Sequence, residues 1–556
     1  MFMAKDAMMM SWTKTLTAFL TAVVIVMSCM TPCDGSYAFQ AFRMQQYQLH
    51  GVSYGCKSAL VNMEVRLANS DLILRRCIFI RIADLTIDKF QALINNGAGA
   101  IVVLLPSEFY TSPMENRKDW LELEHQIMEE EVPVPVYFTV EDANLTSIYT
   151  EIQQSADATS GSTAIAAILD SVASFGYQIY SDGKESKPDS DAKLVNFYGK
   201  LIGFGIEEQL PTIAFVTHYD SFGIAPGLAY GYDTNGSGVV ALLELARLFS
   251  SMYKSGKMRS RYNLLFVLTA GGNFNYHGTK KWIEEELDSA DSNLLTDVDY
   301  VVCIDSIGRS ENLHLHVSKP PKEDTAGYAL VKEFKQTAEM LGINFTMIHK
   351  KINLGEDLLS WEHERFSLRR LPSGTISHFN HHVDKGRRTI SDTRFEANVD
   401  IIEKNVKFIG ESVARYIFNL SSQLQEQQFQ LLTDELSLHR DFIETWMHQL
   451  TKQPRGAQLF GKDHNLLNAF EQVMTAHLKD VKKIIMRPDK KDPEFIFYDS
   501  SLMQLHAYRV KPALFDLFLA IGIAAYVGVV YLVVQNMPTV AGILAYFAIK
   551  SKSKSD

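Results

Sequence analysis

Residues 211–220, Pro-Thr-Ile-Ala-Phe-Val-Thr-His-Tyr-Asp, join a short run of β-branched and aromatic side chains to a polar end. A run of this kind after a proline predicts a buried strand of a largely parallel sheet. Two similar runs follow at 262–268 and 300–304. A helix is predicted over 239–249, between the first and second strands. This alternation of strand and helix predicts an α/β fold.

Polar side chains lie at the ends of these predicted strands. His218 and Asp220 close the first strand, and Asp305 follows the third. Asp233 lies in a glycine-rich loop before the predicted helix. Ligands of open α/β sheets gather outside the carboxyl ends of the strands, so we expect His218, Asp233 and Asp305 to converge there.

This set of residues resembles the metal site of the co-catalytic zinc aminopeptidases, whose superfamily includes the transferrin receptor and nicastrin. The resemblance implies a mixed, mostly parallel sheet of the zinc-aminopeptidase type. It also implies that His218, Asp233 and Asp305 would hold one zinc ion, with Asp220 orienting His218. Asp233 would bridge to a second zinc.

Two positions depart from the enzyme pattern. The Glu-Glu pair that supplies the general base falls on Gly271-Gly272, or on Gly272-Asn273 when Gly278 is the reference. The distal histidine falls on Arg388, and a permanently charged guanidinium cannot bind a metal ion. We therefore predict a degenerate metal site, with no catalytic residue, no metal ion and no cofactor.

Alternatives remain open at this site. Three ligands and a water suffice for zinc, so His218, Asp233 and Asp305 are also compatible with one remaining zinc ion. Otherwise they hydrogen-bond to one another and to Arg388. A further cluster of histidines is expected to form a solvated loop rather than a metal site: His378, His381 and His382.

Length and charge limit the possible classes of protein. A chain of 556 residues accommodates two or three domains with tails. Its formal net charge of -11, without a long basic run, argues against nucleic acid as the main partner.

Residues 1–38 combine two lysines, a short apolar run and a small-residue exit, which is typical of a secretory signal peptide. An uncleaved signal anchor is the alternative. Both place the bulk of the chain in the lumen of the secretory pathway. Sequons for N-glycosylation agree with this placement and occur at Asn144, Asn235, Asn344 and Asn419.

Five cysteines are too few for a disulfide-built domain. Cys29 and Cys33 fall in or just after the apolar run of the signal segment. Cys56 and Cys77 are candidates for a disulfide in an oxidising lumen. Cys303 lies in an apolar strand and is expected to be a buried thiol.

The remaining chain divides into five segments. Residues 39–160 predict a small α/β lobe that resembles the lobe preceding the peptidase-like domain of nicastrin, and 161–423 form the peptidase-like domain. Residues 424–512 show helical spacing and predict a helical lumenal extension. Residues 513–536 are long and apolar enough for one transmembrane helix. Residues 537–556 then form a cytosolic tail.

The tail ends in Lys552-Ser-Lys554-Ser-Asp, a dilysine pattern that serves as a retrieval address to the endoplasmic reticulum. A second apolar stretch at 539–549 is too short to span a membrane alone.

The resemblance to nicastrin-like members of the superfamily covers nearly the whole chain. It implies a non-catalytic, single-pass scaffold of the endoplasmic reticulum membrane, with Nodal modulator and a small multi-pass membrane protein as partners. It further implies that the complex assists the insertion of multi-pass proteins at the Sec translocon and its ribosome. The same resemblance links the complex to Nodal signalling and receptor assembly. The alternatives are a residual lumenal zinc metallopeptidase and a peptide receptor in which Arg388 meets a carboxylate.

Overall fold

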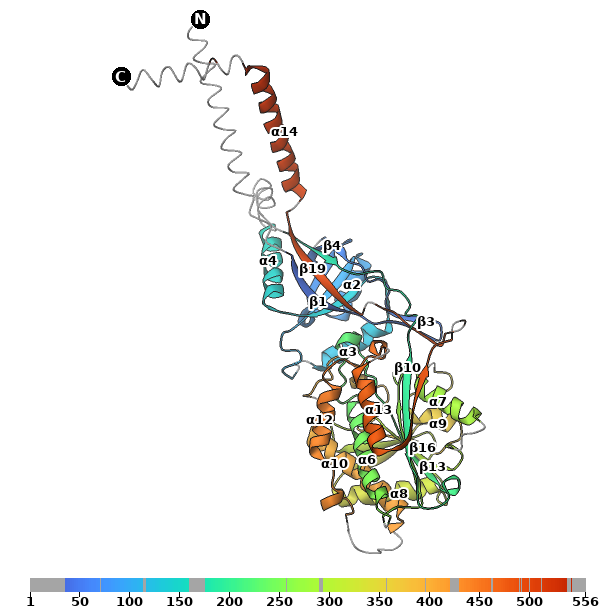
Figure 1. Cartoon of the computed structure of the whole chain (residues 1–556). Coiled ribbons are helices and arrows are strands. Elements are labelled where there is room, and N and C mark those ends of the chain that lie inside the picture. The colour runs from blue at the N-terminus through green and yellow to red at the C-terminus, as the bar shows by residue number, and fades with distance from the viewer. Residues whose placement is uncertain are drawn as a thin grey trace, which may run out of the picture.

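The computed structural model describes residues 36–537 and 542, apart from 71, 114–116, 160–175, 257, 290–293, 357, 396, 421–429, 462–463, 490, 492, 500 and 512. Figure 1 shows a large α/β domain, a smaller lobe above it and one long helix that projects from the lobe. The large domain carries the predicted site, and the lobe lies between that domain and the helix.

An eight-stranded sheet forms the centre of the large domain. The neighbours β12, β11, β13 and β16 run parallel. β10 is antiparallel to β12 on one side, and β14 is antiparallel to β16 on the other. The predicted mixed, mostly parallel sheet is therefore confirmed. In order across the sheet, the strands are β15 (Asn344–His349), β14 (Asn312–Val317), β16 (Ser373–Ser377), β13 (Val298–Ile304), β11 (Thr212–His218), β12 (Asn263–Thr269), β10 (Leu194–Leu201) and β17 (Lys479–Met486).

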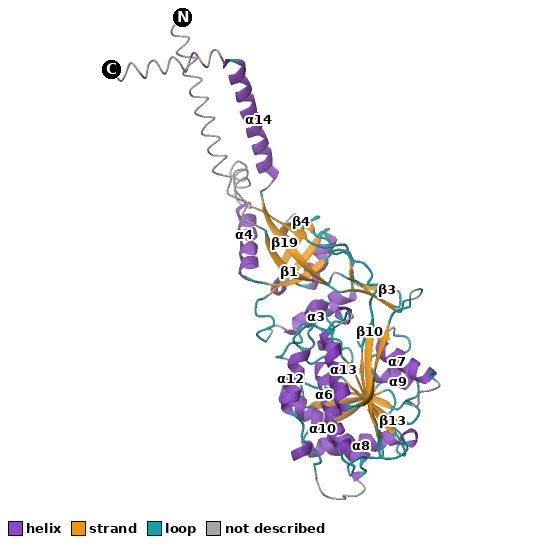
Figure 2. Cartoon of the chain, in the orientation of Figure 1, coloured by secondary structure: helices purple, strands orange, loops and turns teal. Residues whose placement is uncertain are grey.

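Helices cover both faces of this sheet (Figure 2). Successive side chains of a strand point to opposite faces. Phe215 of β11 accordingly joins the core that includes α6, and Val216 joins the core that includes Trp282 of α7 and Phe366 of α9. The helices of the domain are α6 (Gly236–Lys254), α7 (His277–Asp288), α8 (Ala326–Leu341), α9 (His363–Leu368), α10 (Val399–Ile417), α12 (Arg440–Leu450) and α13 (Asn465–His477).

The lobe is a closed barrel with helices packed around it. Its strands β5, β6 and β8 run parallel, and the β1–β19 and β19–β9 pairs are antiparallel. Around the barrel the strands are β1 (Tyr37–Arg43), β19 (Leu502–Val510), β9 (Gly176–Ser181), β4 (Asn62–Leu67), β5 (Cys77–Arg81), β6 (Ala100–Leu105) and β8 (Val136–Val140). The helices are α2 (Ile87–Asn95), α3 (Arg117–Glu129) and α4 (Ala143–Thr159).

A small sheet lies where the lobe meets the large domain. Its hairpin places Tyr47 against Phe274 of the large domain, and Phe274 also packs against Phe497. The sheet comprises β18 (Phe495–Phe497), β2 (Gln46–Leu49), β3 (Val52–Cys56) and β7 (Glu131–Val132). Short 3₁₀ turns complete the fold at η1 (Ile82–Asp84), η2 (Glu207–Gln209), η3 (Pro226–Leu228), η4 (Lys385–Arg387), η5 (Asp434–Leu436) and η6 (Ala457–Leu459).

Glu124 of α3 connects the lobe to the large domain. Its carboxylate is buried and accepts hydrogen bonds from the backbone N–H groups of Ile224 and Ile390, each 3.0 Å long, and from the Thr389 hydroxyl. Burial raises the pKa of Glu124 to about 7, although these hydrogen bonds oppose the shift. The junction therefore contains a carboxyl group that titrates near neutral pH.

The predicted domain boundaries differ from the observed order of elements. β9 lies beyond the predicted end of the lobe at residue 160 and still belongs to the barrel. Residues 424–512 contain the predicted helical part in α12 and α13, but β17, β18 and β19 then follow α13 in three different sheets. β17 is an edge strand of the large sheet, and its lysines are typical of such a strand.

The predicted transmembrane segment 513–536 forms a single helix, α14 (Ala513–Gln535). Its apolar stretch Phe515–Leu532 is long enough to cross a membrane, and it is the one such helix in the part of the chain that is described. The arrangement fits a single-pass membrane protein. The signal segment 1–38 lies outside the described residues except for its last three, of which Tyr37 and Ala38 belong to β1. The stretch 539–549, apart from residue 542, and Lys552 and Lys554 also lie outside them.

The predicted disulfide between Cys56 and Cys77 is wrong, because both thiols are free. Cys56 contacts the main core and its Sγ lies 3.2 Å from the carbonyl oxygen of Met44, whereas Cys77 faces the second core inside the barrel. The two side chains therefore point into different layers. Cys303 is a buried free thiol, as predicted.

The sequons differ in exposure. Asn235 is buried at the start of α6, and its Nδ2 donates to the Thr217 hydroxyl at 2.9 Å and to the His218 carbonyl at 2.7 Å. The folded protein therefore contradicts glycosylation at Asn235. Asn144 and Asn344 are exposed, so glycosylation there stays a prediction. Asn419 follows α10, and part of its sequon falls on residues that are not described.

Candidate functional site

The parallel strands bring the predicted residues to one edge of the sheet. His218 ends β11, Asp220 follows two residues later, and Asp305 follows β13 directly. Asp233 lies before α6 and is fully buried, as is Asp220. The edge thus gathers these side chains in a region with almost no access to solvent, where each charge needs a partner.

His218 is held by a glutamate that sequence reasoning missed. Its Nδ1 lies 3.4 Å from Glu362 Oε2, and Glu362 Oε1 accepts hydrogen bonds from the hydroxyls of Thr269 at 2.8 Å and Thr279 at 2.6 Å. Burial opposes the charged imidazole, but Glu362, Asp220 and Asp305 outweigh it and raise the pKa of His218. The imidazole is therefore biased toward the protonated form, which cannot bind a metal ion.

The His218 ring also occupies the space beside Gly272. A Cβ atom on Gly272 would lie 2.2 Å from both Cδ2 and Cγ of His218. The Gly272 N–H donates to Asp220 Oδ1 at 3.0 Å, which fixes the backbone in this place. Gly271 has a φ of +72°, a conformation that L side chains rarely adopt. The two glycines and the position of His218 therefore depend on each other.

Asp233 is neutralised by an arginine. Its Oδ1 accepts hydrogen bonds from the Ser237 hydroxyl and from the Gly308 N–H, both 2.7 Å long. Its Oδ2 lies 3.1 Å from Arg309 Nε and 3.4 Å from His378 Nδ1. Arg309 also donates to Asp392 Oδ1 at 2.9 Å. Oδ1 of Asp233 is thus occupied by two hydrogen-bond donors, while Oδ2 is held by the charge of Arg309 and receives no hydrogen bond from the described residues.

Asp305 is paired with a different arginine. Its Oδ1 accepts hydrogen bonds from the N–H and the hydroxyl of Ser306, and its Oδ2 lies 2.9 Å from an Arg387 nitrogen. Burial opposes the charged carboxylate, but Arg387 and His218 outweigh it and lower the pKa of Asp305. Arg387 also donates to the Tyr276 hydroxyl at 3.1 Å and stacks over Trp361 at 4.2 Å.

Arg388 does not pair with the predicted acids. Its guanidinium lies over the Phe222 ring, 5.5 Å from the ring centroid, while the neighbouring Arg387 reaches Asp305. The 3₁₀ turn η4 ends at Arg387, and Arg388 leaves it with φ -137° and ψ 78°, so consecutive side chains diverge. The expected contact between Arg388 and the acids is therefore wrong, because Arg387, one residue earlier, makes the contact with Asp305.

The three histidines of the 378–382 segment have different surroundings. His378 Nδ1 lies 3.0 Å from the Ser306 carbonyl oxygen and close to Asp233, so it belongs to the site rather than to a solvated loop. His382 lies 2.8 Å from Lys350 Nζ, and His381 is exposed. The predicted solvated loop is correct for His381 and wrong for His378.

Arg455 is a further buried cation, and no local pattern in the sequence points to it. It comes from the loop between α12 and α13 and donates to the carbonyl oxygens of Tyr219, Tyr230 and Gly231. Burial lowers its pKa to about 10, against the opposing charges of Asp392 and Asp220. Arg455 therefore fixes the loops that carry Asp220 and Asp233.

Zinc does not fit this arrangement. Binding would require His218 to lose its proton and both aspartates to exchange a guanidinium for the metal ion. Within the described part of the chain, no group of three or more His, Cys, Asp or Glu side chains is arranged to hold a metal ion. Arg309 and Arg387 instead provide the positive charge that faces Asp233 and Asp305.

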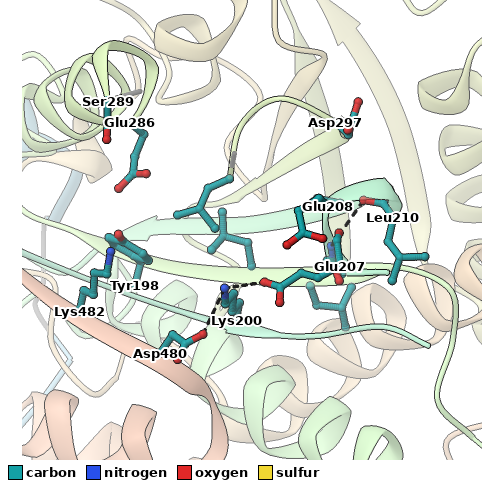
Figure 3. A pocket seen from close by; sticks show the side chains of 15 residues that line it. Tyr198, Lys200, Glu207, Glu208, Leu210, Glu286, Ser289, Asp297, Asp480 and Lys482 are labelled. Carbon is teal, nitrogen blue, oxygen red and sulfur yellow. Dashed lines mark hydrogen bonds and ion pairs between the residues drawn. The ribbon is translucent and has the colours of Figure 1, made fainter. Parts of the chain in front are cut away.

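A cavity of about 310 Å³ lies at the opposite end of the strands (Figure 3). It is lined by Thr212 and Asn263, which begin β11 and β12. Lys200 points between Glu207 and Asp480 and pairs with both, at 2.5 and 3.1 Å. This cavity is therefore separate from the carboxyl edge where His218 and Asp305 meet.

Comparison with known proteins agrees with the fold and covers nearly the whole chain. Residues 205–406 match the model of peptidase family M28. The chain is 43% identical to BOS complex subunit ncln of Danio rerio, over 94% of both chains. It is 29% identical to nicalin of Caenorhabditis elegans, over 91% of this chain and 92% of that one.

Among solved structures, the chain is similar to the gamma-secretase component nicastrin. The TM-score is 0.58 at 10% sequence identity, and the match covers 85% of this chain and 100% of nicastrin. At this identity the similarity shows the fold alone.

Proposed function

This chain belongs to the nicalin family, and from that premise we propose that it is a non-catalytic, membrane-anchored scaffold subunit of a BOS complex. Its relatives carry the name BOS complex subunit and match it over almost their entire length. Such a match covers the lobe, the large domain and the helix α14 together. The proposal therefore concerns the whole architecture rather than the peptidase-like domain alone.

The observation that carries the non-catalytic part is the pairing of Asp233 with Arg309 and of Asp305 with Arg387. In our proposal, these arginines replace the metal ions of the ancestral site. Gly271 and Gly272 stand where the enzymes carry the general base, and a carboxylate at Gly272 would collide with His218. Without a metal-bound water and a base, the site has no means to activate a nucleophile.

The proposal places the chain in the membrane of the endoplasmic reticulum, with its body in the lumen. The helix α14 supports anchoring, and the dilysine pattern of Lys552 and Lys554 supports retrieval. The proposed partners are Nodal modulator and a small multi-pass membrane protein, beside the Sec translocon and its ribosome. In this role the complex assists insertion of multi-pass membrane proteins and influences Nodal signalling and receptor assembly.

Purification of the tagged full-length chain from membranes in a mild detergent tests this proposal. We expect near-stoichiometric membrane partners and translocon components in the eluate. A variant with residues 513–535 replaced by a leucine-alanine span of equal length should lose partners while its lumenal body melts at the same temperature. The control variant Leu354→Ser changes an exposed loop residue and should retain them. A wild-type chain that elutes alone would refute the scaffold proposal.

A further inference from the structure

Arg388 differs from the other arginines around the site because its guanidinium meets no oxygen acceptor among the described residues. Arg309 and Arg387 each pair with a buried aspartate, and Arg455 is enclosed by carbonyl oxygens. In the described part of the chain, no carboxylate or carbonyl oxygen accepts a hydrogen bond from the Arg388 guanidinium. Its charged and titratable neighbours include Tyr47, Tyr54, Tyr276 and Arg387.

Arg388 lies where the lobe meets the large domain, beside Tyr47 of the lobe and Phe222 of the large domain, and we call these three residues the Arg388 site. The Arg388 side chain is only partly exposed, and burial lowers its pKa although the neighbouring tyrosines oppose this. Phe222 lies below the guanidinium, and Tyr47 of β2 packs edge-on against Phe222 with 6.0 Å between the ring centroids. A guanidinium in such a place costs free energy unless an anion satisfies it, and water reaches only part of it.

A second unsatisfied donor lies beside the first. The Tyr47 hydroxyl has no hydrogen-bond partner among the described residues, and Tyr47 is close enough to Arg388 for their charges to interact. Burial raises the pKa of Tyr47 to about 12, so the phenol stays protonated at neutral pH and is available to donate. Two donors from different parts of the molecule therefore lie around the Phe222 ring, with no acceptor among the described residues.

We propose that Arg388 and Tyr47, with Phe222 as an apolar wall, form a binding site for a carboxylate group of another polypeptide. A guanidinium fork matches the planar carboxylate in charge and shape. A single negative charge suffices because Arg387, the nearest other cation, is engaged by Asp305 and Tyr276. The aromatic rings fit the apolar part of the residue that carries the carboxylate.

The carboxylate belongs either to the carboxyl terminus of a polypeptide or to an Asp or Glu side chain. In both cases the bound segment would contact the hairpin of the lobe and the η4 loop of the large domain together, because Tyr47 and Arg388 come from these elements. This inference does not depend on the identity of the BOS complex partners, and its failure would leave the scaffold proposal unaffected.

The test is a thermal melt of the full-length protein in detergent, at constant ionic strength, with three peptides at up to about 20 mM. The first is N-acetylated tetraalanine with a free carboxyl terminus, the second is its amide, and the third is the amide of an N-acetylated tetrapeptide with one glutamate. We expect the melting temperature to rise with the first or the third peptide and not with the neutral amide. Which of the two acts identifies the source of the carboxylate.

Variants then test whether Arg388 and Tyr47 cause the rise in melting temperature. Arg388→Gln should weaken binding at least about tenfold, and Tyr47→Phe should weaken it about threefold. Arg394→Gln removes the same charge from an exposed residue and should bind like the wild type. If Arg388→Gln fails to fold, Arg388→Lys keeps the charge, loses the fork and should bind several-fold more weakly. Equal shifts for acid and amide, or unchanged binding in the Arg388 variants, would overturn the proposal.

Discussion

The carboxyl edge of the large sheet and the Arg388 site receive neighbouring arginines from one loop, yet they treat charge in opposite ways. At the edge, Arg387 is enclosed with Asp305, Tyr276 and Trp361, so positive and negative charges cancel within the chain. In the Arg388 site, the next residue, Arg388, faces aromatic rings and meets no counter-ion among the described residues. The difference indicates that the carboxyl edge is part of the structural core, whereas the charge of Arg388 is not neutralised by the described part of the chain.

The largest expected effect separates the two arginines. Arg387→Gln leaves Asp305 buried without its counter-ion, which typically lowers the free energy of unfolding by about 3 to 5 kcal/mol. Arg388→Gln removes an unpaired charge and should stay within about 1 kcal/mol of the wild type, or rise above it. Thermal and urea melts of both variants measure the difference. Equal stability of the two variants would contradict the claim that Arg387 is neutralised within the chain and Arg388 is not.

A smaller loss of stability is expected when a side chain is added at Gly272 in the buried carboxyl edge. In Gly272→Ala the new methyl group meets the His218 ring, and we expect a loss of about 1 to 3 kcal/mol. Gly256→Ala adds the same methyl group where nothing lies within 4 Å and serves as the control. The double variant Gly272→Ala/His218→Ala should cost less than the sum of the single variants, since the clash is removed. Additive losses would show that the two residues do not share this space.

Glu124 lies where the lobe meets the large domain, and replacing it is expected to stabilise the protein. Folding raises the pKa of Glu124 from 4.5 to about 7, so the folded protein holds its proton more strongly than the unfolded chain does. Stability from this group is present below pH 4.5 and is lost as the pH rises toward 7. At pH 8, Glu124→Gln keeps the acceptor for Ile224 and Ile390 and should be more stable by about 1 to 3 kcal/mol.

Melting curves at pH 5 and pH 8 measure this gain. The advantage of Glu124→Gln over the wild type should shrink at pH 5, where the wild-type carboxyl group is protonated. An advantage that is equal at both pH values would exclude titration of Glu124 as its cause.

His218 gives the smallest predicted effect. Its raised pKa means that the contact with Glu362 contributes stability below pH 6.5, and this contribution is lost as the pH rises through the folded-state pKa. Asp305 has the opposite sign, since its lowered pKa gives stability above pH 3.8 that is lost at lower pH. His218→Gln should therefore flatten the stability profile above pH 6.5, and it should also reduce the loss of stability at acid pH, because His218 helps to lower the pKa of Asp305.

The sequence predicted the frame of the site because local patterns encode it. The apolar runs before His218 and Asp305 mark buried strands, and parallel strands bring their ends together. The partners of these residues could not be predicted, because Glu362 lies 144 residues from His218 and no local pattern links them. The choice between Arg387 and Arg388 depends on the turn η4, whose backbone angles the sequence does not specify.

The same limit explains the errors in the lobe. The barrel is completed by β19, which pairs with β1 from the opposite end of the chain. Such a pairing leaves no local signal in the sequence. The prediction of a helical extension at 424–512 therefore rests on the helical spacing of its first half. Cys56 and Cys77 are close to each other in sequence, but Cys56 lies in β3 of the small sheet and Cys77 in β5 of the barrel, and their side chains join different cores.

The most direct test of the account is the zinc content of the full-length protein after equilibration with excess zinc and removal of free metal by gel filtration. Because Arg309 and Arg387 occupy the oxygens that would bind the metal, the account predicts well below one zinc per chain and an unchanged melting temperature. About one zinc per chain, absent in His218→Ala, would contradict it and restore the carboxyl edge as a metal centre.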